Sequence, residues 1–257
     1  MFRGFNLTID DSDFSEFYLE GERIHLKNKT IVKEGLDRFL DDDGDLSASK
    51  IVGEWFPSIK ADIFLSHSHK DEDMIIALAG WLNCKFQINS FIDSCVWGYS
   101  ENLLKSIDNS YCRQPGKKTF YYDKRNRSTA HVYIMLSTAL SKMIDDCEAV
   151  FFVNTPNSIS SSDYISGADE TLSPWIYSEI AMTRLVRKKS LSEYRGGVSL
   201  EEQTLILKSR GDLNVKYDVD LDHLIDLSCD DLNNWADYRF LRNARHPLDV
   251  LYKLKGF

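Results

Sequence analysis

The sequence has no run of consecutive apolar residues approaching the roughly 18 that a membrane-spanning helix needs. Its first residues, MFRGFNLTIDDSDF, lack the long apolar core of a secretory signal peptide. No internal repeat and no low-complexity linker interrupts the chain. These absences predict a cytoplasmic protein with no membrane partner.

Cysteine is scarce and scattered, and the sequence contains no C-x-x-C pair. An odd number of cysteines without pairing spacing is typical of reduced thiols, and it argues against a disulfide framework or a zinc site. The five are Cys84, Cys95, Cys112, Cys147 and Cys229.

Positive charge is also in short supply, since 31 Lys and Arg face 40 Asp and Glu and the formal net charge is −9. Non-specific binding to nucleic acid or to an anionic membrane requires a positively charged protein surface. The net negative charge therefore disfavours both as partners. A small anionic ligand is not excluded, because it needs only a helix N-terminus or one or two cationic side chains.

One stretch, residues 112–130, departs from this acidic balance and reads as a basic insertion. Such residues interleaved with aromatic rings can bind single-stranded nucleic acid. In so acidic a chain, a self-association surface or a flap over a cleft is favoured over nucleic acid. The cationic residues are Arg113, Lys117, Lys118, Lys124, Arg125 and Arg127, with Phe120, Tyr121 and Tyr122 among them.

Apolar runs predict strands at 61–66, 86–92 and 148–154, and helical periodicity predicts helices near 74–82, 101–111, 130–144 and 173–186. Strands that alternate with helices imply right-handed crossovers and a parallel sheet covered on both faces. The predicted fold is therefore α/β and flavodoxin-like. Weaker signals indicate strands at 204–208 and 215–219, and helix over 230–254 with a break at His246-Pro247.

The pattern divides the 257 residues into three parts. Residues 1–58 are rich in Asp and Glu and are predicted to be an N-terminal extension. Residues 59–228 form the α/β domain, which carries the basic insertion, and residues 229–257 form a C-terminal helical region packed on that domain. In parallel sheets ligands bind beyond the carboxyl ends of the strands. This rule directs attention to Ser66–His69, Asp93–Gly98, 154–157 and the helix that starts near Trp175.

Two motifs at these places resemble those of Toll/interleukin-1 receptor (TIR) domains. Asp62-Ile63-Phe64-Leu65-Ser66-His67-Ser68-His69-Lys70-Asp71 is similar to their first strand and following loop. Val150 to Asn154, followed by Ser173-Pro174-Trp175-x-x-x-Glu179, resembles their third strand and Trp-x-x-x-Glu helix. The resemblance covers about residues 60–190.

The resemblance implies one of two activities. Many bacterial and plant TIR domains hydrolyse or cyclise NAD with the motif Glu, whereas others only assemble with one another. The bacterial proteins often serve antiphage defence or signalling. For this chain the resemblance implies NAD as substrate, no cofactor, self-association and a partner protein in a defence system.

Glu179 is the residue expected to carry the chemistry. Loss of nicotinamide leaves oxocarbenium-like charge on the ribose, and a carboxylate held beneath the sugar stabilises it. Trp175 stands one turn earlier on the same face and is expected to pack against substrate or loop. The plainer alternative is a surface Glu beside a core Trp.

The resemblance places Ser66, His67 and Ser68 on the loop that lines the NAD pocket. The His67-x-His69 pair has no acidic or thiol partner at ligand spacing, so no metal site is expected.

Asp93, Trp97 and Gly98 fall where the mobile second loop of the family lies. Gly98 would allow a positive φ, and Trp97 could stack on a base. A turn glycine and a packed indole are equally compatible with the sequence.

Two other functions stay open. A non-catalytic TIR interaction module would not need Glu179. A nucleoside deoxyribosyltransferase-like enzyme would also set a carboxylate near a ribose. A phosphoacceptor receiver is disfavoured, because Asn154-Thr155 stands where its Asp should be.

Overall fold

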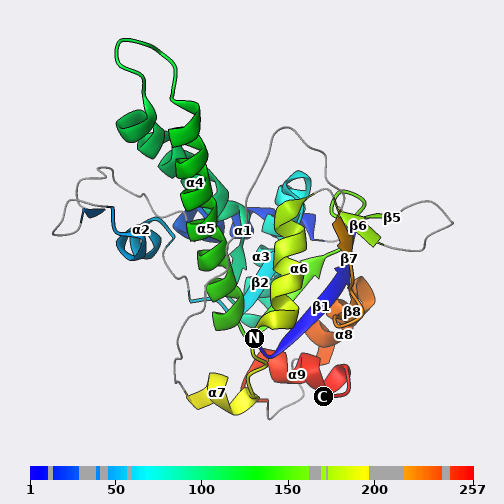
Figure 1. Ribbon diagram of the computed structural model, residues 1–257. Coiled ribbons are helices and arrows are strands. Elements are labelled where there is room, and N and C mark those ends of the chain that lie inside the picture. Colours follow the sequence, from blue (N-terminus) through cyan, green and yellow to red (C-terminus); the bar gives the residue numbers. More distant parts are fainter. Residues whose placement is uncertain are drawn as a thin grey trace.

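In the computed structural model, the described residues are 1–10, 14–28, 39–40, 46–56, 60–161, 169–171, 173–196, 217–238 and 244–257. Five parallel strands form the central sheet in the order β3-β2-β4-β1-β8 (Figure 1). They are β1 (Arg3–Thr8), β2 (Ile63–Ser66), β3 (Ser90–Ile92), β4 (Ala149–Val153) and β8 (Ile225–Ser228). Helices flank this sheet, so the α/β prediction is confirmed and the fold is consistent with a flavodoxin-like arrangement.

The sequence predicted that residues 1–58 form an extension outside the α/β domain, and for the first strand this prediction is wrong. β1 pairs with β4 on one side and with β8 on the other, so it lies inside the sheet. Its side chains alternate, and Phe5 and Leu7 are fully buried. A flavodoxin sheet has the order 2-1-3-4-5, and here the N-terminal strand fills the fourth position beside the β3-β2-β4 half. The acidic composition of residues 1–58 concealed this one alternating strand.

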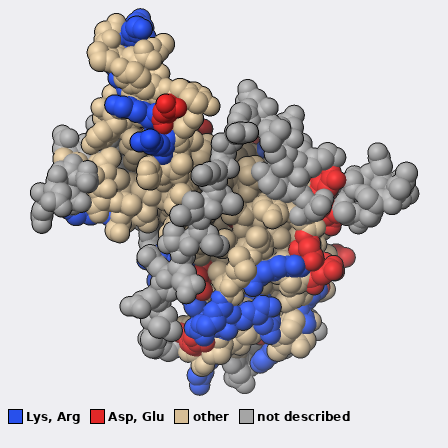
Figure 2. All heavy atoms as spheres, viewed as in Figure 1, with Lys and Arg blue, Asp and Glu red and all other residues tan. Residues whose placement is uncertain are grey.

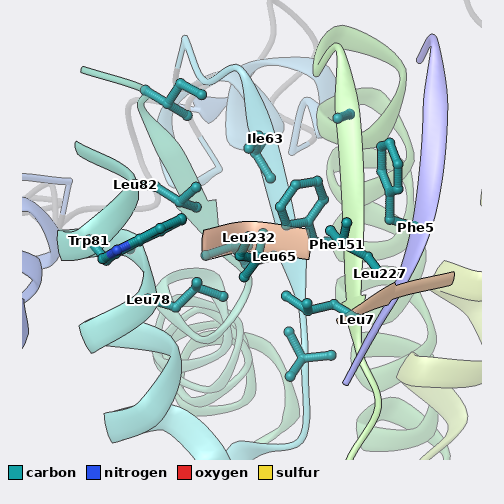
Figure 3. Close-up of a cluster of buried hydrophobic side chains, with 14 of the residues drawn as sticks. Phe5, Leu7, Ile63, Leu65, Leu78, Trp81, Leu82, Phe151, Leu227 and Leu232 are labelled. Atoms are coloured by element: carbon teal, nitrogen blue, oxygen red, sulfur yellow. The ribbon is translucent and has the colours of Figure 1, made fainter. Parts of the chain in front are cut away.

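One face of the sheet is covered by α3 (Glu72–Phe86), α8 (Cys229–Tyr238) and α9 (Pro247–Leu254). Figure 3 shows Ile63 and Leu65 of β2 meeting Leu78 and Leu82 of α3 in this core. Trp81, which belongs to the same cluster, lies against Trp235 of α8, with 6.3 Å between ring centroids. A further helix, α1 (Tyr18–Asn28), packs on α3.

The other face is covered by α4 (Ser94–Ile107), α5 (Tyr122–Asp146), α6 (Pro174–Leu185) and α2 (Ala48–Trp55). Both α4 and α5 begin about two turns earlier than the sequence predicted, at Ser94 and not 101 and at Tyr122 and not 130. The basic insertion is therefore the end of a helical hairpin that projects from the body (Figure 1). Side-chain alternation puts Phe64 on this face, where it packs on Phe91 with 5.3 Å between ring centroids.

The remaining predictions agree with the structure in part. The predicted strand at 86–92 is shorter, since Phe86 ends α3. The helical region at 230–254 is confirmed, and α9 begins at Pro247 with His246 as its N-cap. The strand expected at 215–219 matches β7, and the one at 204–208 lies outside the described residues. No described helix is long and apolar enough to cross a membrane.

The other described elements are short. A three-stranded antiparallel sheet, β5-β6-β7, lies beside α6. Its strands are β5 (Ser160–Ser161), β6 (Asp169–Thr171) and β7 (Tyr217–Val219). The helical pieces are η1 (Ser15–Phe17), η3 (His69–Asp71), the π-helical η4 (Asp108–Cys112) and α7 (Leu191–Gly196).

Candidate functional site

The candidate site begins where β2 ends. Ser66 follows Phe64 on the α6 side of the sheet, and its Oγ donates a hydrogen bond of 2.5 Å to Oε2 of Glu179. Glu179 comes from the second turn of α6 and is only 2% exposed. The predicted helix start is confirmed, because Ser173 caps α6 by accepting a hydrogen bond from Ile176 N–H. Among the predicted site residues, Ser66 and Glu179 are the farthest apart in the sequence, and the fold brings them into direct contact.

His67 and Asp93 meet for a topological reason. β2 and β3 are parallel neighbours, so the residues that follow their carboxyl ends emerge at one edge of the sheet. His67 Nδ1 lies 2.7 Å from Asp93 Oδ1, and both side chains are buried. This ion pair joins the loops that follow the two strands.

The charges of these groups depend on one another. Burial raises the pKa of Glu179 well above 4.5, and the negative charge of Asp93 raises it further, while the hydrogen bond from Ser66 acts in the opposite direction. For His67, burial acts to lower the pKa, but the charge and hydrogen bond of Asp93 outweigh it and the pKa lies above 6.5. The cluster therefore favours a protonated Glu179 and a cationic His67 around the Asp93 carboxylate.

Two buried polar atoms of the cluster stand out. Glu179 Oε1 accepts no hydrogen bond and His67 Nε2 has no partner among the residues that the structure describes, although a neutral Glu179 carboxyl can donate its proton to Asp93. Buried polar atoms without a partner are uncommon in folded proteins, and such atoms are available to a ligand. The cluster therefore offers one carboxyl oxygen and one imidazole nitrogen to a bound molecule.

A second polar cluster holds the neighbouring loops together. Thr155 Oγ1 donates to Asp71 Oδ2, and Asn157 Nδ2 donates to Asp71 Oδ1, each at 2.6 Å. Asp71 ends the short helix η3 after β2, whereas Thr155 and Asn157 follow β4. In the sequence, Asp71 stood out only as the last residue of the motif that resembles the first strand and loop of TIR domains. The signal that could have predicted this cluster is the polar Thr155-Pro156-Asn157, which directly follows the β4 strand.

The other predicted site residues lie apart from the cluster. Ser68 caps η3 through a 3.5 Å contact with Lys70 N–H. Trp175 packs against Tyr133 of α5, with 5.6 Å between ring centroids. Trp97 and Gly98 belong to α4 and not to a loop, so the expectation of a swinging glycine with positive φ is wrong. The apolar period of α4 extends back over the segment that looked like a loop.

Four of the eight predicted residues are therefore brought together: Ser66, His67, Asp93 and Glu179. The arrangement can hold a buried carboxyl in a fixed orientation, change its ionisation and bind a hydroxyl or a cation. Within the described residues, no group of three or more His, Cys, Asp or Glu could hold a metal ion. Comparison of the chain with protein-family models, with curated proteins and with solved structures found no match.

Proposed function

We propose that this protein breaks the nicotinamide–ribose bond of NAD, as a glycohydrolase or a cyclase, with Glu179 as the catalytic carboxylate. The observation that carries the proposal is the buried Glu179, whose Oε2 is held by Ser66 while Oε1 accepts no hydrogen bond from the described residues. The likeness of the β2 loop and of the Trp175-x-x-x-Glu179 helix to TIR domains supports NAD over other N-glycosides. A cytoplasmic role in bacterial defence or signalling belongs to the same proposal.

The chemistry follows from where charge develops. When the bond between ribose C1′ and the pyridinium nitrogen breaks, its electron pair goes to the ring and nicotinamide leaves as a neutral molecule. Positive charge is left on C1′ and the ring oxygen of the ribose. An ionised Glu179 stabilises that charge strongly, because the carboxylate is fixed and removed from water. Water then adds to C1′ and loses a proton, which gives ADP-ribose, whereas attack by an adenine nitrogen gives a cyclic product.

The protonation of Glu179 links binding to reaction. Burial and the charge of Asp93 raise the pKa of Glu179 and so favour the neutral carboxyl in the free protein, but a cationic pyridinium ring beside it favours the ionised form. Binding of NAD is thus coupled to loss of the Glu179 proton. Ser66 holds one carboxyl oxygen in place, so the other faces the ribose.

Burial of the site has a consequence for regulation. Ser66, His67, Asp93 and Glu179 are each 3% exposed or less, so the site opens before a dinucleotide enters. The catalytic activity of such an enzyme stays low until a trigger or an assembly step favours the open state.

The experiment incubates the purified full-length chain at high concentration with NAD and follows nicotinamide release by chromatography. Glu179→Gln is compared with Glu101→Gln, which changes an exposed residue of α4 in the same way. Release is expected from the wild type and from Glu101→Gln, and none from Glu179→Gln. The co-product peak separates ADP-ribose from a cyclic isomer.

Two outcomes would contradict the proposal. Equal release by Glu179→Gln would remove Glu179 from the reaction. Exchange of nucleobases between deoxynucleosides, without nicotinamide release, would favour the deoxyribosyltransferase alternative.

A further inference from the structure

The projecting hairpin is the most basic part of the molecule. Its end, residues 111–127, holds six Lys and Arg and one Asp, a formal charge of +5 in a chain of net charge −9. We call these residues the basic tip. All six cations are exposed, and so are Tyr111, Tyr121 and Tyr122, the last at 78%. Tyrosine and arginine together on an exposed, convex surface are typical of contact residues in protein interfaces.

The basic tip is held rigid from inside. Ser128 Oγ donates to the buried Asp108 at 2.5 Å, and Arg125 Nε donates to the same carboxylate at 3.1 Å. The backbone closes the turn as well, since Gln114 N–H donates to Thr119 O and Tyr121 N–H to Cys112 O. A surface that is ordered before binding loses little conformational entropy when it docks.

An acidic segment of comparable size lies elsewhere on the chain. Residues 217–237, from β7 through α8, contain seven Asp and no Glu, Lys or Arg, a formal charge of −7. We call these residues the acidic edge. Arg184 pairs with Asp220 and Lys255 with Asp231, so a large negative excess is left. The exposed members are Asp220, Asp222, Asp226, Asp230 and Asp237.

The fold places the two charged segments on opposite sides. β3, which leads into the hairpin, is one outer strand of the sheet, and β8, within the acidic edge, is the other. In Figure 2 blue atoms lie on the projecting hairpin and also form a patch low on the same face, and red atoms gather at the right of the view, where Figure 1 has β6 and β7. Because the two segments face away from each other, one molecule cannot neutralise its own tip.

We propose that the basic tip of one copy of this chain docks on the acidic edge of a second copy. The charges are complementary in sign and similar in size, and both surfaces are exposed. A contact between two different surfaces is heterologous, so it adds further copies beyond the dimer. A second copy fits better than nucleic acid, because the acidic edge and the rest of the chain would repel phosphates.

The test is a charge swap followed by sedimentation velocity of the full-length chain. Changing Lys117, Lys118 and Lys124 together to Glu reverses the tip, from a formal charge of +5 to −1. Changing Asp222, Asp226, Asp230 and Asp237 together to Lys reverses the edge, from −7 to +1. Each variant alone is expected to raise the dissociation constant of self-association about tenfold or more, because like charges then face each other. An equimolar mixture of the two variants is expected to restore assembly, since each reversed surface then finds an opposite partner.

The matched control changes Lys60, Lys70 and Lys142 together to Glu, which makes the same change in net charge as the tip reversal at exposed residues off the tip and off the edge. It is expected to leave assembly within about twofold of the wild type, as distant exposed charges are largely screened. Circular dichroism melts verify that every variant folds. Assembly of the wild type is expected to weaken between about 0.1 M and about 1 M salt, as the Debye length falls from about 10 Å to about 3 Å.

Three results would overturn the proposal. A wild type that is monomeric at high protein concentration and low salt is one, and a mixture of the two reversed variants that fails to assemble is another. The third uses labelled oligo-dT as a probe. If a monomeric wild type binds it and the tip-reversed variant does not, the tip is a nucleic-acid surface instead.

Discussion

Ser66 Oγ donates a 2.5 Å hydrogen bond to Oε2 of Glu179, a residue 113 positions further along the chain. The contact links the carboxyl end of β2 to the second turn of α6 inside the protein. It fixes one oxygen of a carboxyl whose pKa is raised by burial and by the nearby charge of Asp93.

Glu179→Gln should make the protein more stable at neutral pH. The amide keeps the shape of the side chain, its oxygen can accept the Ser66 hydrogen bond, and it removes a buried group that resists ionisation. The melting temperature should rise by a few degrees, at about 2–4 °C per kcal/mol for a chain of this size. Differential scanning calorimetry beside Glu101→Gln measures the effect. A lower melting temperature for Glu179→Gln would show that the carboxyl stabilises the fold.

Stability of the wild type should fall as pH rises from about 5 to about 8. The unfolded carboxyl of Glu179 loses its proton near 4.5 while the folded one keeps it, so ionisation favours the unfolded state above that pH. His67 acts in the same direction, because its folded pKa lies above 6.5 and its contribution is lost as pH rises through that value. Melts across this range should show a shallower slope for Glu179→Gln. An identical slope in both proteins would contradict the raised pKa of Glu179.

Asp93→Asn should lower the pKa of His67 below 6.5. The charge and hydrogen bond of Asp93 are the largest influences that oppose burial, and without them only the smaller effects of the Leu65 carbonyl and the Glu72 charge oppose it. Titration of the His67 ring signals by NMR measures the change directly. Asp73→Asn, at an exposed position, should leave the pKa of His67 where it is. A titration midpoint that is unmoved by Asp93→Asn would argue against the ion pair.

Asp71→Ala should destabilise the protein by about 1–3 kcal/mol, because it leaves the Thr155 hydroxyl and the Asn157 amide without their acceptor. Urea unfolding gives this free energy, with Asp237→Ala on the surface of α8 as the control. The control should stay within about 0.5 kcal/mol of the wild type. Equal effects of the two substitutions would mean that the Asp71 contacts carry no net stability.

Phe5→Ala should cost about 3–5 kcal/mol of unfolding free energy, as expected for a large side chain removed from a core. Phe5 is fully buried in β1 and its ring packs on Phe151, with 5.3 Å between centroids. Thr8→Ala changes an exposed residue of the same strand and should have a small effect. If Phe5→Ala unfolds like the wild type in urea, β1 does not belong to the cooperative core.

The strongest local signals in the sequence led to correct elements. The apolar runs that became β2 and β4 and the Ser173-Pro174 helix start all lie where they were predicted. Such signals work because burial on both faces and capping are requirements of a few adjacent residues. They also identified the sheet edge at which Ser66, His67, Asp93 and Glu179 gather.

What the sequence determined by itself was the α/β class, the edge of the sheet that carries polar residues, and the acidic balance with one basic stretch. Only the tertiary structure decided that β1 enters the sheet between β4 and β8 and that Trp97 and Gly98 lie in a helix. It also decided that Glu179 is buried against Ser66 and near Asp93. The physical reason is that strand order, burial and pKa depend on contacts between residues far apart in the chain, and local patterns do not encode those contacts.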